Sequence, residues 1–290
     1  MPRLLLFVSV GVATIGWLGW HYGAVTLSHG TVAEMPVPED GKVVGGKYVN
    51  DYFGLSYPLP QGWTEGLQGP GPSGSGYYVL KDLVPQSELG ATILIAAQDM
   101  FFASKAYADV AEMVGDFRQA MSQVDGMTID REPTEVKVAD RLLYRVDFSG
   151  VGLYRVTFAT EIRCHAVSFN LTSHDPELLA NLAASVDKLA SAASQSSGVP
   201  HCIGNYAVPE NLLRRVEPVA VGPRFMPIPV RIIIDTQGSV KHVHVIHATE
   251  EQRKSIENAL REWKFKPYTL DGRAVEIETG LVFRFKVAQN

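Results

Sequence analysis

The sequence predicts an α+β protein built mainly from antiparallel sheets and preceded by an N-terminal transmembrane helix. Three observations support this fold class. An apolar run, Leu4–Tyr22, opens the chain. Short segments of alternating apolar and polar residues, separated by turns rich in Gly and Pro, then recur and predict strands. Apolar residues at three- and four-residue spacing predict helices around positions 107–124, 178–189 and 256–263.

The composition is that of a folded chain of one large or two ordinary domains. The 290 residues are 46% hydrophobic and 20% charged, and the formal net charge is -5. A nucleic-acid-binding protein needs a basic face, so this charge balance argues against a nucleic-acid partner.

The first element is a predicted membrane anchor, residues 1–22. Its apolar run is about nineteen residues long, which is enough for a helix to cross a bilayer. Trp17 and Trp20 lie near its far end, where aromatic side chains suit the lipid–water boundary. The alternative is a cleaved signal peptide, with Thr31-Val32-Ala33 as the candidate cleavage site.

The charges on either side of this segment predict its orientation. Arg3 precedes it, whereas Glu34, Glu39 and Asp40 follow before the first lysine, Lys42. Because positive charge stays in the cytoplasm, we expect a single-pass inner-membrane protein of bacteria with its C-terminal bulk in the periplasm. Residues 23–45, rich in Gly, Pro and small residues, are a predicted tether.

Residues 46–190 read as one α+β domain of antiparallel strands and two helices. Strands are expected at Tyr77–Leu83, Ala91–Ala97 and Arg141–Ser149, among others. Asp175-Pro176 predicts the start of the second helix, because a carboxylate N-cap precedes a proline at the first helical position. The Ser-rich residues 191–203 are a predicted linker.

The opening phrase of this domain carries a family resemblance. It resembles the start of PsbP-like domains at the following positions: Tyr48, Asn50, Phe53, Gly54, Tyr57, Pro58, Pro60, Gly62 and Trp63. The resemblance implies an antiparallel α/β sandwich and the role of an accessory subunit. By analogy alone it suggests a photosynthetic or electron-transfer assembly.

Residues 204–290 form a second, smaller predicted domain. Strand Val230–Asp235 leads through a turn at Gly238 to a strand in which a bulge near Lys241–His242 would bring three valines to one face. Thr249 and Gln252 form a capping box for the following helix. The last strand runs from Ile277 through Phe285 with alternating burial, and Glu278 is expected on its outer face.

This order of elements resembles the TonB C-terminal domain. The matching phrases are Asp235-x-x-Gly238-x-Val240, Val243-x-Val245, Ala259-Leu260-x-x-Trp263-x-Phe265-x-Pro267, Asp271-Gly272-x-x-Val275 and Phe283-x-Phe285. The resemblance implies protein–protein interaction through an exposed sheet edge that an extended segment of an outer-membrane receptor can join.

Three features depart from the TonB pattern. A folded domain replaces the long Pro-rich spacer, and Ser9 and His21 are too far apart for the motor-binding spacing of the anchor. The stretch PVAVGPRFMPIP replaces the usual Tyr-Pro motif ahead of the first strand. These departures weaken the expectation of energy transduction.

Two sets of residues are candidate ligands or cross-links. His242 and His244 have the His-x-His spacing of a zinc site, but an exposed polar strand face is the favoured interpretation, so we expect neither a metal nor a cofactor. Cys164 and Cys202 are a candidate disulfide in an oxidising compartment. Two unpaired thiols, or a zinc site that includes the neighbouring His165 and His201, are the alternatives.

The sequence contains no catalytic or phosphate-binding motif. We therefore expect a non-enzymatic protein that docks at the inner membrane as an accessory subunit of a membrane protein complex, without a small-molecule substrate. The alternatives are an atypical TonB-like transducer that contacts an outer-membrane receptor and an unrecognised enzyme with a site in the cleft between the domains.

Overall fold

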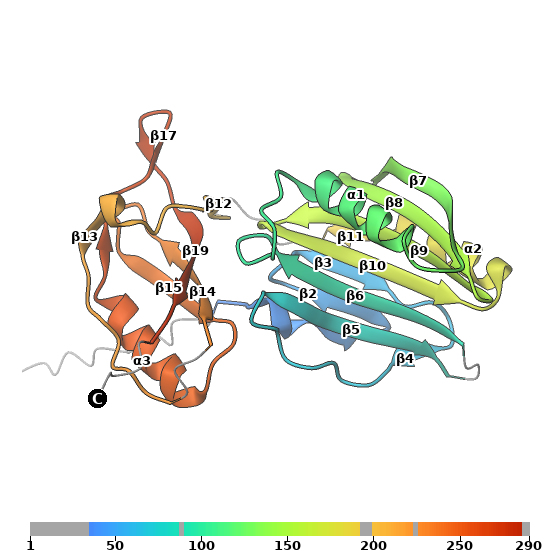
Figure 1. Ribbon diagram of the computed structural model, residues 1–290, viewed down its shortest axis with the longest axis horizontal. Coiled ribbons are helices and arrows are strands. Elements are labelled where there is room, and N and C mark those ends of the chain that lie inside the picture. Colours follow the sequence, from blue (N-terminus) through green and yellow to red (C-terminus); the bar gives the residue numbers. More distant parts are fainter. Residues whose placement is uncertain (1–34, 87–89, 192–198, 223–225, 286–290) are drawn as a thin grey trace, which may run out of the picture. The chain divides into compact units, whose positions relative to one another are not determined.

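A computed structural model describes residues 35–86, 90–191, 199–222 and 226–285. The predicted anchor, residues 1–22, lies outside these ranges. No helix within them is long and apolar enough to cross a membrane. The fold is α+β and rich in sheet, as the sequence predicts (Figure 1).

The larger module is built on a seven-stranded antiparallel sheet with the order β4-β5-β6-β10-β9-β8-β7. Its strands are β4 (Trp63–Glu65), β5 (Tyr77–Pro85), β6 (Ala91–Asp99), β7 (Met127–Val138), β8 (Arg141–Gly150), β9 (Leu153–Ile162) and β10 (His165–Ser173). The sequence predicts two strands, Met127–Asp130 and Glu135–Val138, where β7 is continuous. Pro133 lies in this strand, which is tolerated because β7 is at the edge of the sheet and its register shifts nearby.

The two faces of this sheet are covered differently. Helix α1 (Val110–Met121) packs on one face and buries Val110 and Val114 (Figure 1). The other face packs against α2 (Pro176–Ser185) and a small sheet of β1 (Lys42–Val44), β2 (Lys47–Asn50), β3 (Leu55–Pro58) and β11 (Ala190–Ser191). The resulting sandwich buries the aromatic residues of the opening phrase, including Tyr48, Phe53 and Tyr57.

The helix starts follow from local chemistry. Asp175 accepts hydrogen bonds from the backbone N–H groups of Glu177 and Leu178, as its N-cap position predicts. Helix α1 begins later than the apolar periodicity suggests, because Asp109 caps it by accepting from the Glu112 N–H. Tyr107 therefore lies before the helix, and Val124 lies after it because the helix ends at Met121.

Part of the predicted tether is folded. Residues 38–40 form a short 3-10 turn, and β1 pairs with β2. Asn50 holds the turn by donating from Nδ2 to the Pro38 carbonyl at 2.8 Å. Short strands also form at both ends of the predicted Ser-rich linker, where β11 pairs with β3 and β12 (His201–Cys202) pairs with the C-terminal sheet.

The C-terminal module is a four-stranded sheet with the order β12-β19-β14-β15 and one covering helix. Its elements are β14 (Ile228–Ile234), β15 (Val240–Val245), α3 (Glu250–Arg261) and β19 (Ile277–Phe283), with the short strands β13 (Leu212–Arg214), β16 (Lys264–Phe265), β17 (Thr269–Leu270) and β18 (Arg273–Ala274). A short 3-10 turn, η3 (Pro209–Asn211), precedes β13, and another, η2 (Val186–Lys188), follows α2.

Two predictions for this module are confirmed. Thr249 and Gln252 form the capping box of α3. The register of β14 and β15 skips Lys241, which is the predicted bulge. One face of the sheet packs on α3 and encloses its own core, which includes Val230, Ile256 and Trp263.

Candidate docking site

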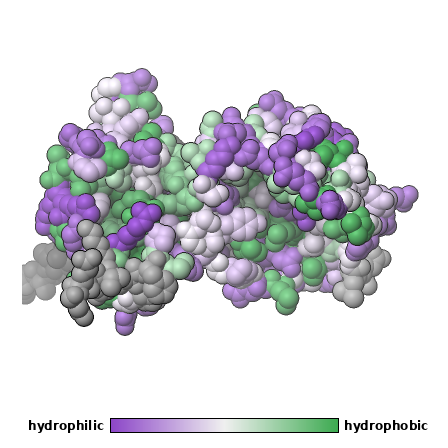
Figure 2. All heavy atoms as spheres, in the orientation of Figure 1, coloured by the Kyte–Doolittle hydropathy of each residue, from purple (hydrophilic) through white to green (hydrophobic). Residues whose placement is uncertain are grey.

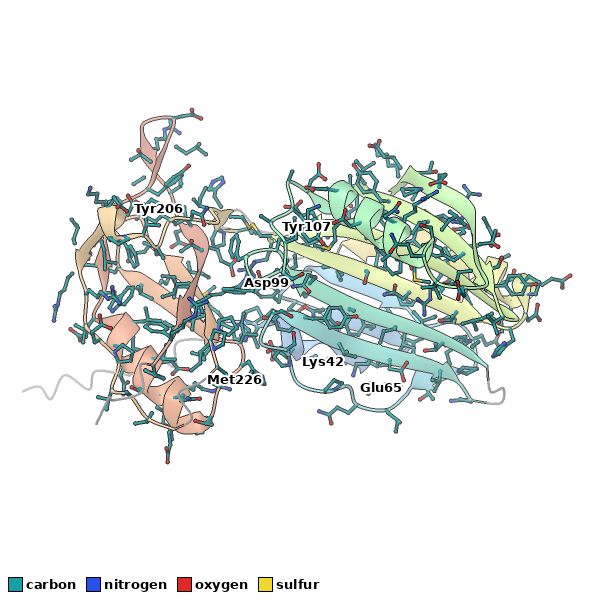
Figure 3. All side chains as sticks on the ribbon, in the orientation of Figure 1. Lys42, Glu65, Asp99, Tyr107, Tyr206 and Met226 are labelled. Atoms are coloured by element: carbon teal, nitrogen blue, oxygen red, sulfur yellow. A yellow bond between two sulfur atoms is a disulfide. The ribbon has the colours of Figure 1, made fainter. Side chains whose placement is uncertain are left out.

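The opposite face of the C-terminal sheet is buried against the larger module. Arg231 interrupts the apolar strand β14 and points away from α3, yet only 1% of its surface is exposed. Its guanidinium group forms a bidentate pair with Asp99, at the end of β6, with Nε–Oδ2 at 2.5 Å and Nη2–Oδ1 at 3.1 Å. Figure 3 labels Asp99. Arg231 therefore joins the two modules by a buried ion pair.

Glu278 of β19 extends this pair into a cluster. Its Oε1 atom lies 3.0 Å from Arg231 Nη1 and accepts a 3.0 Å hydrogen bond from the Tyr52 hydroxyl. Its Oε2 atom lies 2.9 Å from Arg163 Nη2, and the Arg163 guanidinium stacks on the Tyr52 ring at 3.9 Å. Glu278 was expected on a solvent-facing side of its strand, and that expectation is wrong because the larger module covers this side.

The pKa shifts follow from burial and from these neighbours. Burial alone would raise the pKa of Glu278, but the charges of Arg231 and Arg163 lower it below its usual value. Burial raises the pKa of Asp99 despite Arg231. His165, which is fully buried and faces Arg231, has a pKa well below its ordinary value because burial disfavours the charged imidazolium.

The tip of the β9–β10 hairpin enters the same cluster. Its two turn residues, Arg163 and Cys164, both have positive φ angles, 51° and 53°. Such a two-residue turn usually contains Asn or Gly, since side chains disfavour this conformation. Arg231 donates to the carbonyl oxygens of both residues at 3.2 Å. The larger module's turn is thus held by a side chain of the C-terminal module.

Cys164 and Cys202 form a disulfide, with their Cα atoms 6.0 Å apart. The bond links the tip of the β9–β10 hairpin to β12. Of the three alternatives that the sequence leaves open, the structure has the disulfide and neither two free thiols nor a zinc site with His165 and His201. His165 instead places Nδ1 2.8 Å from the Arg163 carbonyl, so the ring belongs to the buried cluster.

The predicted weak metal candidates do not lie on an open face. His244 is 9% exposed, stacks on Tyr78 and places Nε2 3.3 Å from Glu39 of the larger module. The expectation of a solvent-exposed histidine face is therefore wrong for His244, which is buried. His242 is half-buried, so its side chain is partly exposed to solvent. Across the ranges that the structure describes, no three His, Cys, Asp or Glu side chains are grouped so that they could hold a metal.

The outer edge of β19 is only partly occupied. The backbone N–H of His201 in β12 donates to the Glu276 carbonyl, and that of Ile203, which follows β12, donates to the Glu278 carbonyl, both at 2.9 Å. Backbone groups alternate in direction along a strand, so those of Gly280 and Val282 point to this same side. In the described part of the chain, no strand pairs with β19 there beyond Glu278.

A groove of about 740 Å³ runs beside this open edge. Gly280, Val282 and Phe283 of β19 line it, with Val208, Leu212 and Trp263 from other segments of the C-terminal module. Its charged lining residues are Arg215, Glu217 and Arg284. On the face shown in Figure 2, hydrophobic and hydrophilic residues are interspersed, with no large patch of either kind.

Gly280, which lines the groove, also lies against the larger module. A Cβ atom at this position would lie 2.9 Å from Phe101 Cβ and 2.9 Å from Phe102 Cζ, both in the loop after β6. Glycine therefore allows the larger module to pack closely against the sheet. Sequence reasoning did not find Asp99, Arg163, Arg231, Tyr52 or this glycine as members of a site.

A comparison with protein-family models supports the TonB resemblance of the C-terminal module. Residues 227–287 match the family model for the C-terminal domain of the Gram-negative bacterial TonB protein, so the TonB resemblance is confirmed for this module. No protein in a search of curated sequences matches the chain.

Solved structures show more distant likenesses. The solution structure of cyanobacterial PsbP (CyanoP) from Synechocystis sp. PCC 6803 is 15% identical, with a TM-score of 0.36, and covers 52% of this chain and 98% of its own. A crystal structure of a protein of unknown function from Pseudomonas aeruginosa is 14% identical, with a TM-score of 0.30, and covers 55% of this chain and 96% of its own.

Proposed function

We propose that the chain is a non-enzymatic docking protein of the Gram-negative cell envelope. In this proposal, residues 1–22 anchor it in the inner membrane, and its folded part acts in the periplasm as an accessory subunit of a membrane protein complex. The C-terminal module captures an extended segment of the partner along the open edge of β19. The TonB C-terminal match supports an envelope protein that binds other proteins.

The observation that carries this proposal is the unpaired edge at Gly280 and Val282 beside the groove. An extended segment placed there gains main-chain hydrogen bonds from the edge and apolar contacts from the groove. The other edge of the sheet, β15, is less suited to pairing. It carries the bulge at Lys241, and a charged residue at a bulge disfavours the addition of a strand.

A docking role also fits the chemistry of the groove and the cluster. The groove is lined by apolar side chains and exposed backbone. Its three charged residues can form ion pairs or hydrogen bonds with polar groups of a partner segment. The buried titratable groups pair with one another: Asp99 and Glu278 each face Arg231. We infer that they hold the modules together rather than perform catalysis.

The test removes one hydrogen-bond donor from the edge. Val282→Pro deletes the outward N–H of an edge residue, whereas the matched control Val282→Ala keeps that N–H and trims the side chain. We expect the partner complex to co-purify with the wild-type and Val282→Ala proteins from gently solubilised membranes, and to be lost with a folded Val282→Pro protein. A chain that elutes alone in every form would overturn the proposal.

A second candidate is an atypical TonB-like transducer, which the family match of residues 227–287 favours. It would hand force or a signal to an outer-membrane receptor through the same edge. Reach limits this function: residues from 38 onward of the predicted tether are folded, and the 15 residues 23–37 extend at most roughly 54 Å. Crosslinking of β19 to a receptor plug would support it, and normal uptake of TonB-dependent ligands in a deletion strain would contradict it.

A further inference from the structure

The docking edge already holds a short strand of the chain itself. Strand β12 contributes only His201 and Cys202, and pairs in parallel with Ile277 and Glu278. A pairing of this length is marginal by itself. The disulfide to Cys164 fastens β12 to the turn of the β9–β10 hairpin, which the buried cluster holds in place.

We propose that β12 is a displaceable occupant of the docking edge, retained by the Cys164–Cys202 disulfide and released when a dithiol oxidoreductase reduces it. This inference rests on the proposed docking function and adds its regulation. Release frees the carbonyl oxygens of Glu276 and Glu278, which accept from His201 and Ile203 in the oxidised protein. The open edge then begins at Glu276 instead of Gly280, so a longer partner segment can pair with β19.

The chain that follows β12 stays in place on release. Tyr206 is 7% exposed, its hydroxyl donates to the Lys266 carbonyl at 2.6 Å, and its N–H donates to Thr279 Oγ1 at 3.3 Å. These contacts fix the segment from Gly204 onward. Release is therefore confined to β12 and ends before the groove, which Gly204 borders.

The redox step is thiol–disulfide exchange with a dithiol partner. Both cysteines are half-buried, so a thiolate can approach them. The partner's thiolate attacks one sulfur of the Cys164–Cys202 bond and forms a mixed disulfide, and its second thiol then displaces the protein sulfur. The partner ends as a disulfide, and Cys164 and Cys202 end as thiols that have received its two electrons and two protons.

Hydrogen exchange of the full chain tests the release without any docking partner. In the protein reduced with dithiothreitol, and in Cys164→Ser/Cys202→Ser, we expect the His201 and Ile203 amides to exchange at least ~10-fold faster than in the oxidised protein. The Ile246 amide, which donates to the Pro229 carbonyl, serves as the control and should not change. Unchanged exchange at His201 and Ile203, or an equal rise at Ile246, would overturn the proposal.

A defined peptide tests whether the freed edge accepts a strand. The probe is a fluorescent copy of residues 199–203 carrying Cys202→Ser. We expect it to bind the reduced chain and the Cys164→Ser/Cys202→Ser chain at least ~10-fold more tightly than the oxidised chain, because only an empty edge can pair. Equal binding to both forms would refute the inference.

The same probe separates this inference from the docking proposal. The peptide pairs at Glu276 to Glu278, so Val282→Pro should leave its binding unchanged while partner docking is lost. If β12 stays bound after reduction but Val282→Pro still abolishes docking, the regulation is wrong and the docking function stands.

Discussion

Replacement of Arg231 by methionine should destabilise the protein far more than loss of a surface arginine. The change leaves the Asp99 carboxylate buried without its bidentate partner. Glu278 keeps Arg163 and Tyr52, and the Arg163 and Cys164 carbonyls keep His165 Nδ1 and the Met100 N–H. The cost is thus concentrated on Asp99. Removal of one partner of a buried ion pair costs about 3–5 kcal/mol in free energy of unfolding.

The assay is urea unfolding of the full chain, followed by tryptophan fluorescence. Trp63 lies in the larger module and Trp263 in the C-terminal module, so the signal responds to both. The control is Arg214→Met, because Arg214 pairs with Glu262 where both side chains are more than half exposed. Surface pairs of this kind contribute about 0–1 kcal/mol.

A double variant tests the cause of the loss. Asp99→Asn in the Arg231→Met background removes the unpaired charge and should restore part of the stability, which a double-mutant cycle measures as a coupling energy. If Arg231→Met costs no more than Arg214→Met, the buried cluster does not hold the modules together and our reasoning is refuted.

Three further predictions concern the contacts around this cluster. Gly280→Ala should lower the free energy of unfolding by about 1–3 kcal/mol, measured in urea, because its Cβ would overlap Phe101 and Phe102. Cys164→Ser/Cys202→Ser should lower it by about 2–4 kcal/mol relative to the oxidised chain. Acidification from pH 6.5 to pH 5.5 should lower it by about 1 kcal/mol through His165, whose depressed pKa means that the unfolded chain binds a proton that the folded chain does not.

Each of these has a matched control. Gly71→Ala should be neutral, since nothing lies within 4 Å of an added Cβ there, and an equal loss would contradict the packing argument. The double-serine variant retains no cysteine, so it should unfold identically with and without dithiothreitol. His165→Phe keeps the ring contacts, and Arg231 still donates to the Arg163 carbonyl. The free energy of unfolding of this variant should therefore change less between pH 6.5 and 5.5 than that of the wild-type protein. An unchanged pH dependence in this variant would exclude His165 as the cause.

The features that the sequence predicts correctly are those with a local cause. The capping box at Thr249, the N-cap at Asp175 and the bulge near Lys241 each depend on a few neighbouring residues. Alternation likewise identifies the core face of β14, with Val230, Ile232 and Ile234 buried. These patterns involve residues close together in the chain, so a single sequence is enough to predict the caps, the bulge and the buried face.

The packing of the C-terminal module against the larger module cannot be predicted from a local pattern of residues. Alternation assigns Glu278 to an outer face, and only the pairing with Arg231 and Arg163 shows that this face is covered. Asp99 lies more than a hundred positions before Arg231, so spacing does not connect them. The one available clue is a single arginine within the apolar run Ile228–Ile234, because an isolated charge in a buried strand requires a partner.

The most direct test of the docking proposal is site-specific photocrosslinking from the edge of β19 in intact membranes. Probes at Val282 and Arg284 should crosslink to one extended segment of a single partner protein, with the site of attachment displaced by about two residues between them, as strand pairing requires. A probe at the exposed Leu142 of the larger module is the control. Scattered products, or the same products from Leu142, would contradict capture of a partner strand at this edge.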